Sequence, residues 1–261
     1  MQFLVVVPAH NEERWIGHGL ATIAAARAQY AGAVETIVVA NRCTDATAEI
    51  AQRMGARVVE NGARNIAAVR NAGAAAATGA ALVTIDADCL MAPNALLEIA
   101  RLLQSGRFVG GGTKVVPSRS SAGIRATYAL VRVMTLMTRL SGAMFWCDRA
   151  DFDAVGGFDE GRILAEDLDF ARRLRAHGRR TRRSFVELRA APVVASTGSS
   201  TSSATGTCSR WRASCAQFEP GTKGSIPAAP LGTSSTSTPT RAGNGDRASC
   251  AGSGRLRVRR R

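Results

Sequence analysis

Residues 3–12 read FLVVVPAHNE, an apolar run that ends in a proline and a polar loop. A strand that is apolar at every position, without alternation, is typical of a parallel sheet covered on both faces. Similar short runs, rich in Val and Ile, lie at 34–39, 57–59 and 82–85. The first 90 residues therefore predict four strands of a parallel sheet.

Segments rich in Ala and Glu separate these runs, at residues 12–30, 45–54 and 63–78. Strands and helices that alternate in this way form right-handed crossovers, with helices on both faces of the sheet. We therefore expect an α/β fold, a three-layer sandwich with a mostly parallel central sheet. The later elements that we expect are helices at 96–103, 122–140 and 164–176, the last stopped by Gly178, and strands at 108–116, interrupted by three glycines, and 143–147.

Polar clusters follow three of the strands directly, at residues 9–12, 41–45 and 86–88. In parallel α/β sheets the ligand site lies beyond the carboxyl ends of the strands. We expect these three loops to converge on one edge of the sheet.

Asp86 and Asp88 close the fourth strand. Two carboxylates separated by one residue at a strand end supply hard oxygen ligands for Mg²⁺ or Mn²⁺, which in turn bridges a diphosphate. The alternative is a solvated turn, where Asp is common.

Glu166, Asp167 and Asp169 open the last expected helix. At ~100° per residue, Asp167 falls within the apolar arc of residues 164–174, whereas Glu166 and Asp169 point away from it. A carboxylate on the buried side of a first turn is costly without a role, and the helix dipole favours its ionised form, as a general base requires. The alternative is an acid that merely complements the dipole.

Arg70 and Asn71 lie on the helix that precedes the Asp-x-Asp strand. An arginine at this place is suited to contact phosphate in bidentate fashion, with a solvated helical face as the alternative.

In order and spacing, these motifs resemble the family-2 glycosyltransferases of the nucleotide-diphospho-sugar transferase (GT-A) fold, which is Rossmann-like. The motifs are VVVPAHNEE at 5–13, N-x-CTD-x-T at 41–47, RN-x-G at 70–73, D-x-D at 86–88, GGFDE at 156–160 and ED-x-D at 166–169. The resemblance covers about residues 2–190.

The resemblance implies transfer of a sugar from a nucleotide-diphosphate donor to a hydroxyl acceptor, saccharide or lipid-linked, with inversion at the anomeric carbon. The residues that it places at the donor are Pro8, Ala9, Asn11, Glu12, Asn41, Asp45, Arg70 and Asp86. It assigns Asp86 and Asp88 to Mg²⁺ or Mn²⁺, and Asp167, beside Glu166, to catalysis as the base. The family usually has an acidic residue at the position of Ala40, so a uridine preference does not carry over.

Two other classes of protein share some of these features. A nucleotidyltransferase would show a Gly-rich loop with Arg and Lys after the first strand, and residues 9–11 are Ala-His-Asn instead. A nucleic-acid-binding protein is suggested by the pI of 11.1 and by the arginines at 172–183 and 255–261. However, Arg outnumbers Lys 32 to 2, as GC-rich coding bias produces, and aromatic residues are not interleaved. We therefore expect no nucleic-acid partner.

The net charge of +14 is unevenly distributed. Residues 1–195 carry 24 Lys and Arg against 18 Asp and Glu, whereas residues 196–261 carry 10 against 2. This last part holds 22 Ser and Thr and 9 Gly, and such a composition buries too little apolar surface to offset chain entropy. We expect a glycosyltransferase-like domain over 1–192 and a low-complexity, disordered tail over 193–261.

The tail departs from the folded continuation that the resemblance implies. If residues 198–208 are read one base out of frame, legal codons permit RQLDEFGDWHV, which looks like such a continuation. We hypothesise a change of reading frame near residue 197, with an authentic Ser/Gly-rich tail as the alternative. A frameshifted chain would lack acceptor contacts and be a catalytically impaired, truncated glycosyltransferase.

No apolar stretch reaches the ~18–20 residues that span a bilayer, and residues 1–20 lack an export signal. We therefore expect a cytoplasmic protein. Arginines recur every seven residues in the expected helix at 122–140. This basic stripe suits peripheral contact with an anionic membrane, with packing against the domain as the alternative.

Overall fold

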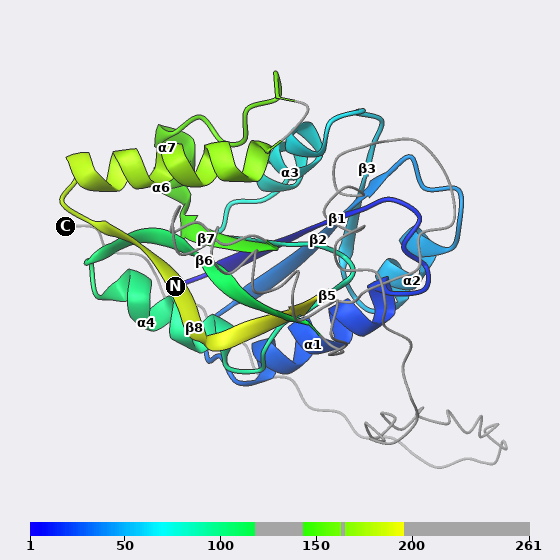
Figure 1. Cartoon of the computed structure of the whole chain (residues 1–261). Helices are drawn as coiled ribbons and strands as arrows, with labels where there is room; N and C mark the ends of the chain where they lie inside the picture. The colour runs from blue at the N-terminus through cyan, green and yellow to red at the C-terminus, as the bar shows by residue number, and fades with distance from the viewer. Residues whose placement is uncertain (118–142, 163–164, 196–261) are drawn as a thin grey trace, which may run out of the picture. The chain divides into compact units, whose positions relative to one another are not determined.

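The structure is a computed structural model, and it describes residues 1–117, 143–162 and 165–195 (Figure 1). The helix expected at 122–140 and the tail beyond residue 195 lie outside the described residues.

The described strands form one mixed sheet of eight strands in the order β3-β2-β1-β4-β7-β6-β8-β5. Their bounds are β1 Phe3–Ala9, β2 Val34–Asn41, β3 Arg57–Asn61, β4 Ala81–Ile85, β5 Cys89–Leu90, β6 Phe108–Pro117, β7 Met144–Asp148 and β8 Ser184–Ala195. Strands β1 to β4 are mutually parallel, as expected. The antiparallel β7 separates β4 from β6, which runs parallel to β8.

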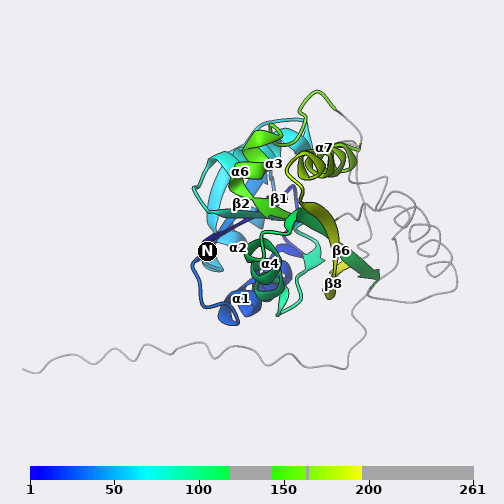
Figure 2. The ribbon, with the colours of Figure 1, turned by 90° about the vertical axis from the view of Figure 1, so that its left-hand side faces the viewer.

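Helices cover both faces of this sheet (Figures 1 and 2). Their bounds are α1 Ile16–Ala28, α2 Thr47–Arg53, α3 Ile66–Ala75, α4 Ala95–Gln104, α6 Arg149–Ala154 and α7 Glu166–Arg180. One apolar core joins α1, α2 and α4 to one face, and a second joins α3, α6 and α7 to the other. The expected three-layer α/β sandwich is therefore confirmed.

The unbroken apolar run at the start of the chain is explained by this double coverage. In β1, Phe3, Val5 and Val7 belong to one core, whereas Leu4 and Val6 belong to the other. Because alternate side chains of a strand point to opposite faces, both faces here demand apolar residues.

Two glycine-based expectations were wrong. The glycines at 110–112 do not interrupt β6, which runs from Phe108 to Pro117, although its pairing with β8 shifts register between Phe108 and Gly110. Close packing requires glycine here, because a Cβ at Gly111 would lie 2.6 Å from the Trp146 ring and 2.0 Å from the Val186 carbonyl oxygen. Gly178 does not stop α7, which continues to Arg180. A Cβ at Gly178 would lie 2.7 Å from Val109, so close packing on β6 requires this glycine.

Candidate functional site

The polar loops after β1, β2 and β4 meet at one edge of the sheet, as expected. Ala9 pairs with Ala40 at the ends of β1 and β2, and Val6 pairs with Thr84 near the end of β4. Since these strands are parallel and in register, their carboxyl ends lie side by side. Pro8 and Ala9 are themselves buried residues of β1, so the polar groups come from the residues that follow.

Hydrogen bonds join the first two loops into one unit. The backbone N–H of Glu12 donates to the Thr47 hydroxyl at 2.7 Å, and that of Thr44 donates to Asn11 Oδ1 at 2.8 Å. Asn11 adopts a left-handed conformation with φ 53°, which Asn tolerates better than most residues. The motif that contains Thr47 was visible in the sequence, but its bridging role was not.

Asp45 adds a charged link between the same loops. Its carboxylate accepts from the backbone N–H of Glu13 at 3.1 Å, and from the N–H and hydroxyl of Thr47 at 3.0 and 2.5 Å. Burial alone would raise the pKa of Asp45, but these hydrogen bonds to its charged form outweigh burial and hold the pKa below its usual value.

The side-chain amide of Asn41 is hydrogen-bonded to other residues of the protein. This residue is buried, and its side-chain N–H groups donate to the carbonyl oxygens of Asn61 and Ala63 at 3.2 and 2.8 Å and to Asn61 Oδ1 at 3.2 Å. The amide therefore joins the ends of β2 and β3. His10 Nδ1 lies 2.6 Å from the Asn41 carbonyl oxygen, which links the β1 loop to the same point.

Arg70 connects two acidic motifs at the centre of the site. This side chain is buried on α3, and its guanidinium donates to Asp86 Oδ1 at 2.9 Å and to Glu166 Oε1 at 3.0 Å. The guanidinium also lies over the ring of Phe158, 5.3 Å from its centroid. Neither ion pair was anticipated, because the partners lie 16 and 96 residues away along the chain.

The expected orientation of the acidic helix start was wrong. The buried positions of α7 are Glu166, Phe170, Ala171, Leu174 and Gly178. Glu166 is therefore the carboxylate that faces the protein, whereas Asp167 is half-buried. The apolar residues at 164–174 predict a different phase for the helix, but the helix begins only after Ala165, which is left-handed with φ 58°.

Burial raises the pKa of the Glu166 carboxyl, and the charge of Arg70 opposes this shift. Among the described residues Asp167 forms no ion pair: its Oδ1 accepts from the backbone N–H of Leu168 at 2.7 Å, and its Oδ2 has no hydrogen bond. The two neighbouring acids of α7 thus differ, one held by an ion pair and the other available at one oxygen.

Asp86, Asp88 and Cys89 form a group that suits a metal ion. One ligand atom from each lies within 4.8 Å of the others. Carboxylate oxygens are the ligands that Mg²⁺ and Mn²⁺ prefer, so the two aspartates fit such an ion. Cys89 had not been expected in this group, and its Sγ lies 3.7 Å from Asp88 Oδ1.

Asn65, the N-cap of α3, and Asn71 within this helix hold the GGFDE segment against this site. Asn71 donates to the Phe158 carbonyl oxygen at 2.8 Å and accepts from the Phe158 N–H at 2.9 Å, and Asn65 donates to the Glu160 carbonyl oxygen. Gly157 has φ 65°, and a Cβ there would lie 2.8 Å from Asn71 Oδ1. The structure thereby explains why the RN and GGFDE motifs occur together.

The mixed sheet, its two helical layers and the carboxylates after β4 define a protein of the GT-A fold. The model of the family described as Glycosyl transferase family 2 matches residues 4–152. The chain belongs to this family. No curated protein matches the chain in sequence.

Solved glycosyltransferases resemble the chain in fold. TarS residues 1–349 from S. aureus, in complex with UDP-GlcNAc, is 18% identical with a TM-score of 0.58, over 77% of this chain and 60% of that one. Mannosyltransferase PcManGT from Pyrobaculum calidifontis, with GDP-Man and Mn²⁺, is 22% identical with a TM-score of 0.55, over 71% and 54%.

Glucosyl-3-phosphoglycerate synthase from Mycobacterium tuberculosis, in complex with Mn²⁺, UDP and glucosyl-3-phosphoglycerate, is 20% identical with a TM-score of 0.53, over 74% and 71%. The chain spans 33% of the length of S. aureus TarS and 54–60% of the length of TarS 1–349. Within the described part of this chain, no helix combines the length and apolarity needed to cross a membrane.

Proposed function

We propose that the chain is a metal-dependent, inverting glycosyltransferase that moves a sugar from a nucleotide-diphosphate donor to a hydroxyl acceptor. The observation that carries the proposal is the position of Asp86 and Asp88 at the carboxyl end of β4, on the same edge as the joined loops after β1 and β2. The family match and the nucleotide-bound structural relatives support it.

Asp86 and Asp88 would hold Mg²⁺ or Mn²⁺, which when bound neutralises charge on the leaving diphosphate. The loops that contain Asn11, Glu12 and Asp45 would hold the nucleotide, because their mutual hydrogen bonds pre-form that surface. Asn41 would contribute by fixing the end of β2 rather than through its own amide. Pro8 and Ala9, at the end of β1, would form the base of the same nucleotide-binding surface.

Asp167 would be the catalytic base, because its Oδ2 has no hydrogen bond among the described residues. It takes the proton of the acceptor hydroxyl as that oxygen bonds to the anomeric carbon and the bond to the diphosphate oxygen breaks. A single displacement of this kind inverts the anomeric centre. Glu166 and Arg70 would act as positioning residues, since each is bound to the other.

The proposal places this activity in the cytoplasm, with an acceptor that is a saccharide or a lipid-linked molecule. A lipid-linked acceptor would require peripheral contact with the membrane. The domain expected over 1–192 would carry the donor site. Its expected end falls within β8, which continues to Ala195.

The test begins with a thermal-shift screen of nucleotide sugars, with Mn²⁺ and with chelator. A ligand present at 100 times its Kd raises stability by about 2.7 kcal/mol, which is easily detected. With the donor found, Asp88→Asn should lose metal-dependent donor binding. Asp167→Asn should keep donor binding and lose transfer.

Glu49→Gln is the matched control, because Glu49 is an exposed acid in the first turn of α2. Metal-independent donor binding, or full transfer by Asp167→Asn, would contradict the proposal. Donor binding without transfer by the wild-type chain would indicate the catalytically impaired form that a frameshifted tail implies.

A further inference from the structure

A cluster of arginines lies at the opposite edge of the sheet from the proposed donor site. Residues 172–183 contain seven arginines and no acidic residue, and they form the end of α7 and the turn into β8 (Figure 1). Ser184, the first residue of β8, pairs with Phe108 at the start of β6. Since α7 rises 1.5 Å per residue, Arg179 lies about 20 Å along the helix from Glu166.

Three of these arginines line a hollow of about 200 Å³. Its lining consists of Arg175, Arg179, Arg183, Ser184 and Phe185. Three of the five lining side chains are cationic, and none of the five is acidic. Pockets for drug-sized ligands measure roughly 300–1,000 Å³, so this hollow suits a small group rather than a whole nucleotide.

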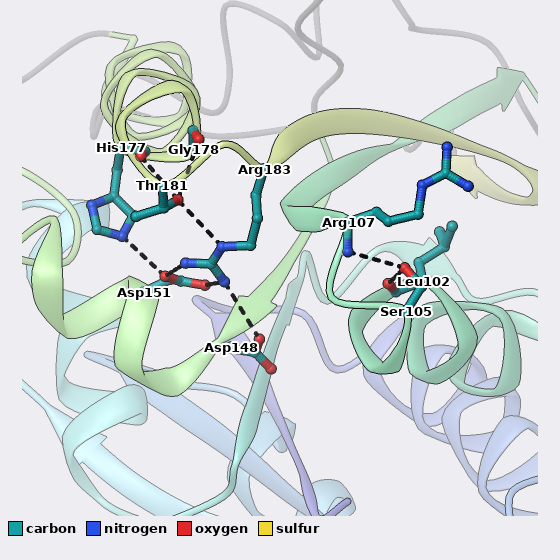
Figure 3. A network of polar contacts seen from close by, with 9 residues as sticks. All are labelled: Leu102, Ser105, Arg107, Asp148, Asp151, His177, Gly178, Thr181 and Arg183. Carbon is teal, nitrogen blue, oxygen red and sulfur yellow. Dashed lines mark hydrogen bonds and ion pairs between the residues drawn. The ribbon is translucent and has the colours of Figure 1, made fainter.

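Arg183, which lines the hollow, is held in place by a network of polar contacts (Figure 3). Its two terminal nitrogens donate to the buried carboxylate of Asp151 at 2.7 and 2.6 Å, and its Nε donates to the Thr181 hydroxyl at 3.2 Å. His177 Nε2 lies 3.0 Å from the same carboxylate. A guanidinium has five N–H groups, so these three bonds orient it and leave two N–H groups without a hydrogen bond to the described residues.

Part of the positive charge around the hollow has no carboxylate partner among the residues that the structure describes. Asp151 offsets the charge of Arg183, with Asp148 at 4.0 Å. Within the described ranges, Arg179, Arg180 and Arg182 form no ion pair with a carboxylate. The carbonyl end of α7 stabilises a cation in the last turn, but it does not explain a hollow bounded by three of them.

We propose that this hollow binds a phosphate group, at a site separate from the donor site. Arginine offers paired N–H donors that match phosphate oxygens, and the pre-oriented Arg183 lowers the entropic cost of binding. The Ser184 hydroxyl supplies a further donor. The phosphate belongs either to a small phosphorylated molecule or to a lipid headgroup, and both present the same oxygens.

The test compares Arg179→Gln with Arg27→Gln in the full chain. Both arginines are exposed, lie in the last turn of a long helix and form no ion pair among the described residues, so the control matches in type and position. Residues 196–261 are the same in both variants, so their positive charge does not affect the comparison. Arg183 is not substituted in the main variant, because its loss would leave the buried Asp151 carboxylate without its arginine partner and destabilise the fold.

Inorganic phosphate is titrated into each protein by calorimetry at constant ionic strength. A chelator is present so that no metal ion at Asp86 and Asp88 binds the phosphate. In a second arm, the proteins are sedimented with vesicles of phosphatidylglycerol or phosphatidylcholine. Arg27→Gln should match the wild type in both arms. Arg179→Gln should bind the phosphate source at least about tenfold more weakly.

Binding of inorganic phosphate that depends on Arg179 supports a small phosphorylated ligand. Sedimentation with phosphatidylglycerol alone that depends on Arg179 supports a lipid headgroup. Equal behaviour of the two variants, or no binding of either source, overturns the proposal. An oligonucleotide that binds equally to both variants, while phosphate and vesicles do not bind, also overturns it.

Discussion

Arg70 and Glu166 form a buried ion pair at 3.0 Å between residues that lie 96 positions apart in the sequence. The same guanidinium binds Asp86 at 2.9 Å. One side chain of α3 therefore joins the strand that ends in the Asp-x-Asp motif to the start of α7. Any metal or donor bound at Asp86 would be mechanically connected to the helix that carries Asp167.

Arg70→Gln should destabilise the protein strongly. Breaking a buried pair leaves an uncompensated carboxylate, which costs about 3–5 kcal/mol, and the pKa of Glu166 should rise further because Arg70 holds it down. Urea unfolding measures the change. Arg101→Gln is the control, because its pair with Glu98 is exposed and exposed pairs contribute about 1 kcal/mol or less. Equal losses in the two variants would refute a structural role for Arg70.

The two acids at the start of α7 should differ in their effect on catalysis. Asp167→Asn removes the proposed base, which should lower the transfer rate by about 100-fold or more. Glu166→Gln still offers an oxygen to Arg70, so its loss should be below about tenfold. Single-turnover transfer at saturating donor separates the variants. The reverse order would show that Glu166, and not Asp167, is the base.

Asp45 should contribute stability that depends on pH. Because its folded pKa is lowered, this contribution is present above the pKa of the unfolded state and is lost as the pH falls through the folded value. The stability difference between the wild type and Asp45→Asn should therefore shrink below about pH 4. Asp45 is only half-buried, so solvent screening limits the difference to about 1 kcal/mol or less. Unfolding curves between pH 6 and pH 3 test this, and a constant difference would contradict it.

Gly73→Ala should destabilise the contact between α3 and the sheet. A Cβ at this position would lie 2.3 Å from Val6 Cγ1 and 2.8 Å from Val39 Cγ2, so the helix must move away from β1 and β2. Overpacking of this kind typically costs about 1–3 kcal/mol. The control is Gly62→Ala, where the new Cβ has no neighbour within 4 Å. Similar unfolding midpoints for both variants would show that the packing is looser than described.

The coding DNA tests the hypothesis of a changed reading frame near residue 197. If it is correct, the codons for residues 198–208, shifted by one base, should encode RQLDEFGDWHV or a similar string. Codons that forbid such a string would establish the Ser/Gly-rich tail as authentic. Restoring the shifted frame in an expressed protein should then raise transfer activity without changing donor binding.

Much of the site could be predicted because it is built from short motifs that are continuous in the sequence. The apolar runs at 3–7 and 82–85 are long enough to mark buried strands, and polar residues directly after parallel strands must share one edge. This reasoning located Asp86, Asp88 and the two loops that Thr47 joins. It did not predict β7 between β4 and β6, because strand order depends on pairing between distant segments.

The orientation of α7 shows where local pattern was insufficient. Leu168 and Leu174 suggested one apolar face, yet packing against Phe158 and the charge of Arg70 turned Glu166 inward instead. A helix can rotate about its axis at little local cost, so its phase follows the partners it meets. Hydrophobic runs and the order of the motifs were thus enough to predict the layers, the site edge and the family resemblance. The burial of Glu166 and its pairing with Arg70 required the tertiary structure, because only the complete fold brings those two side chains together.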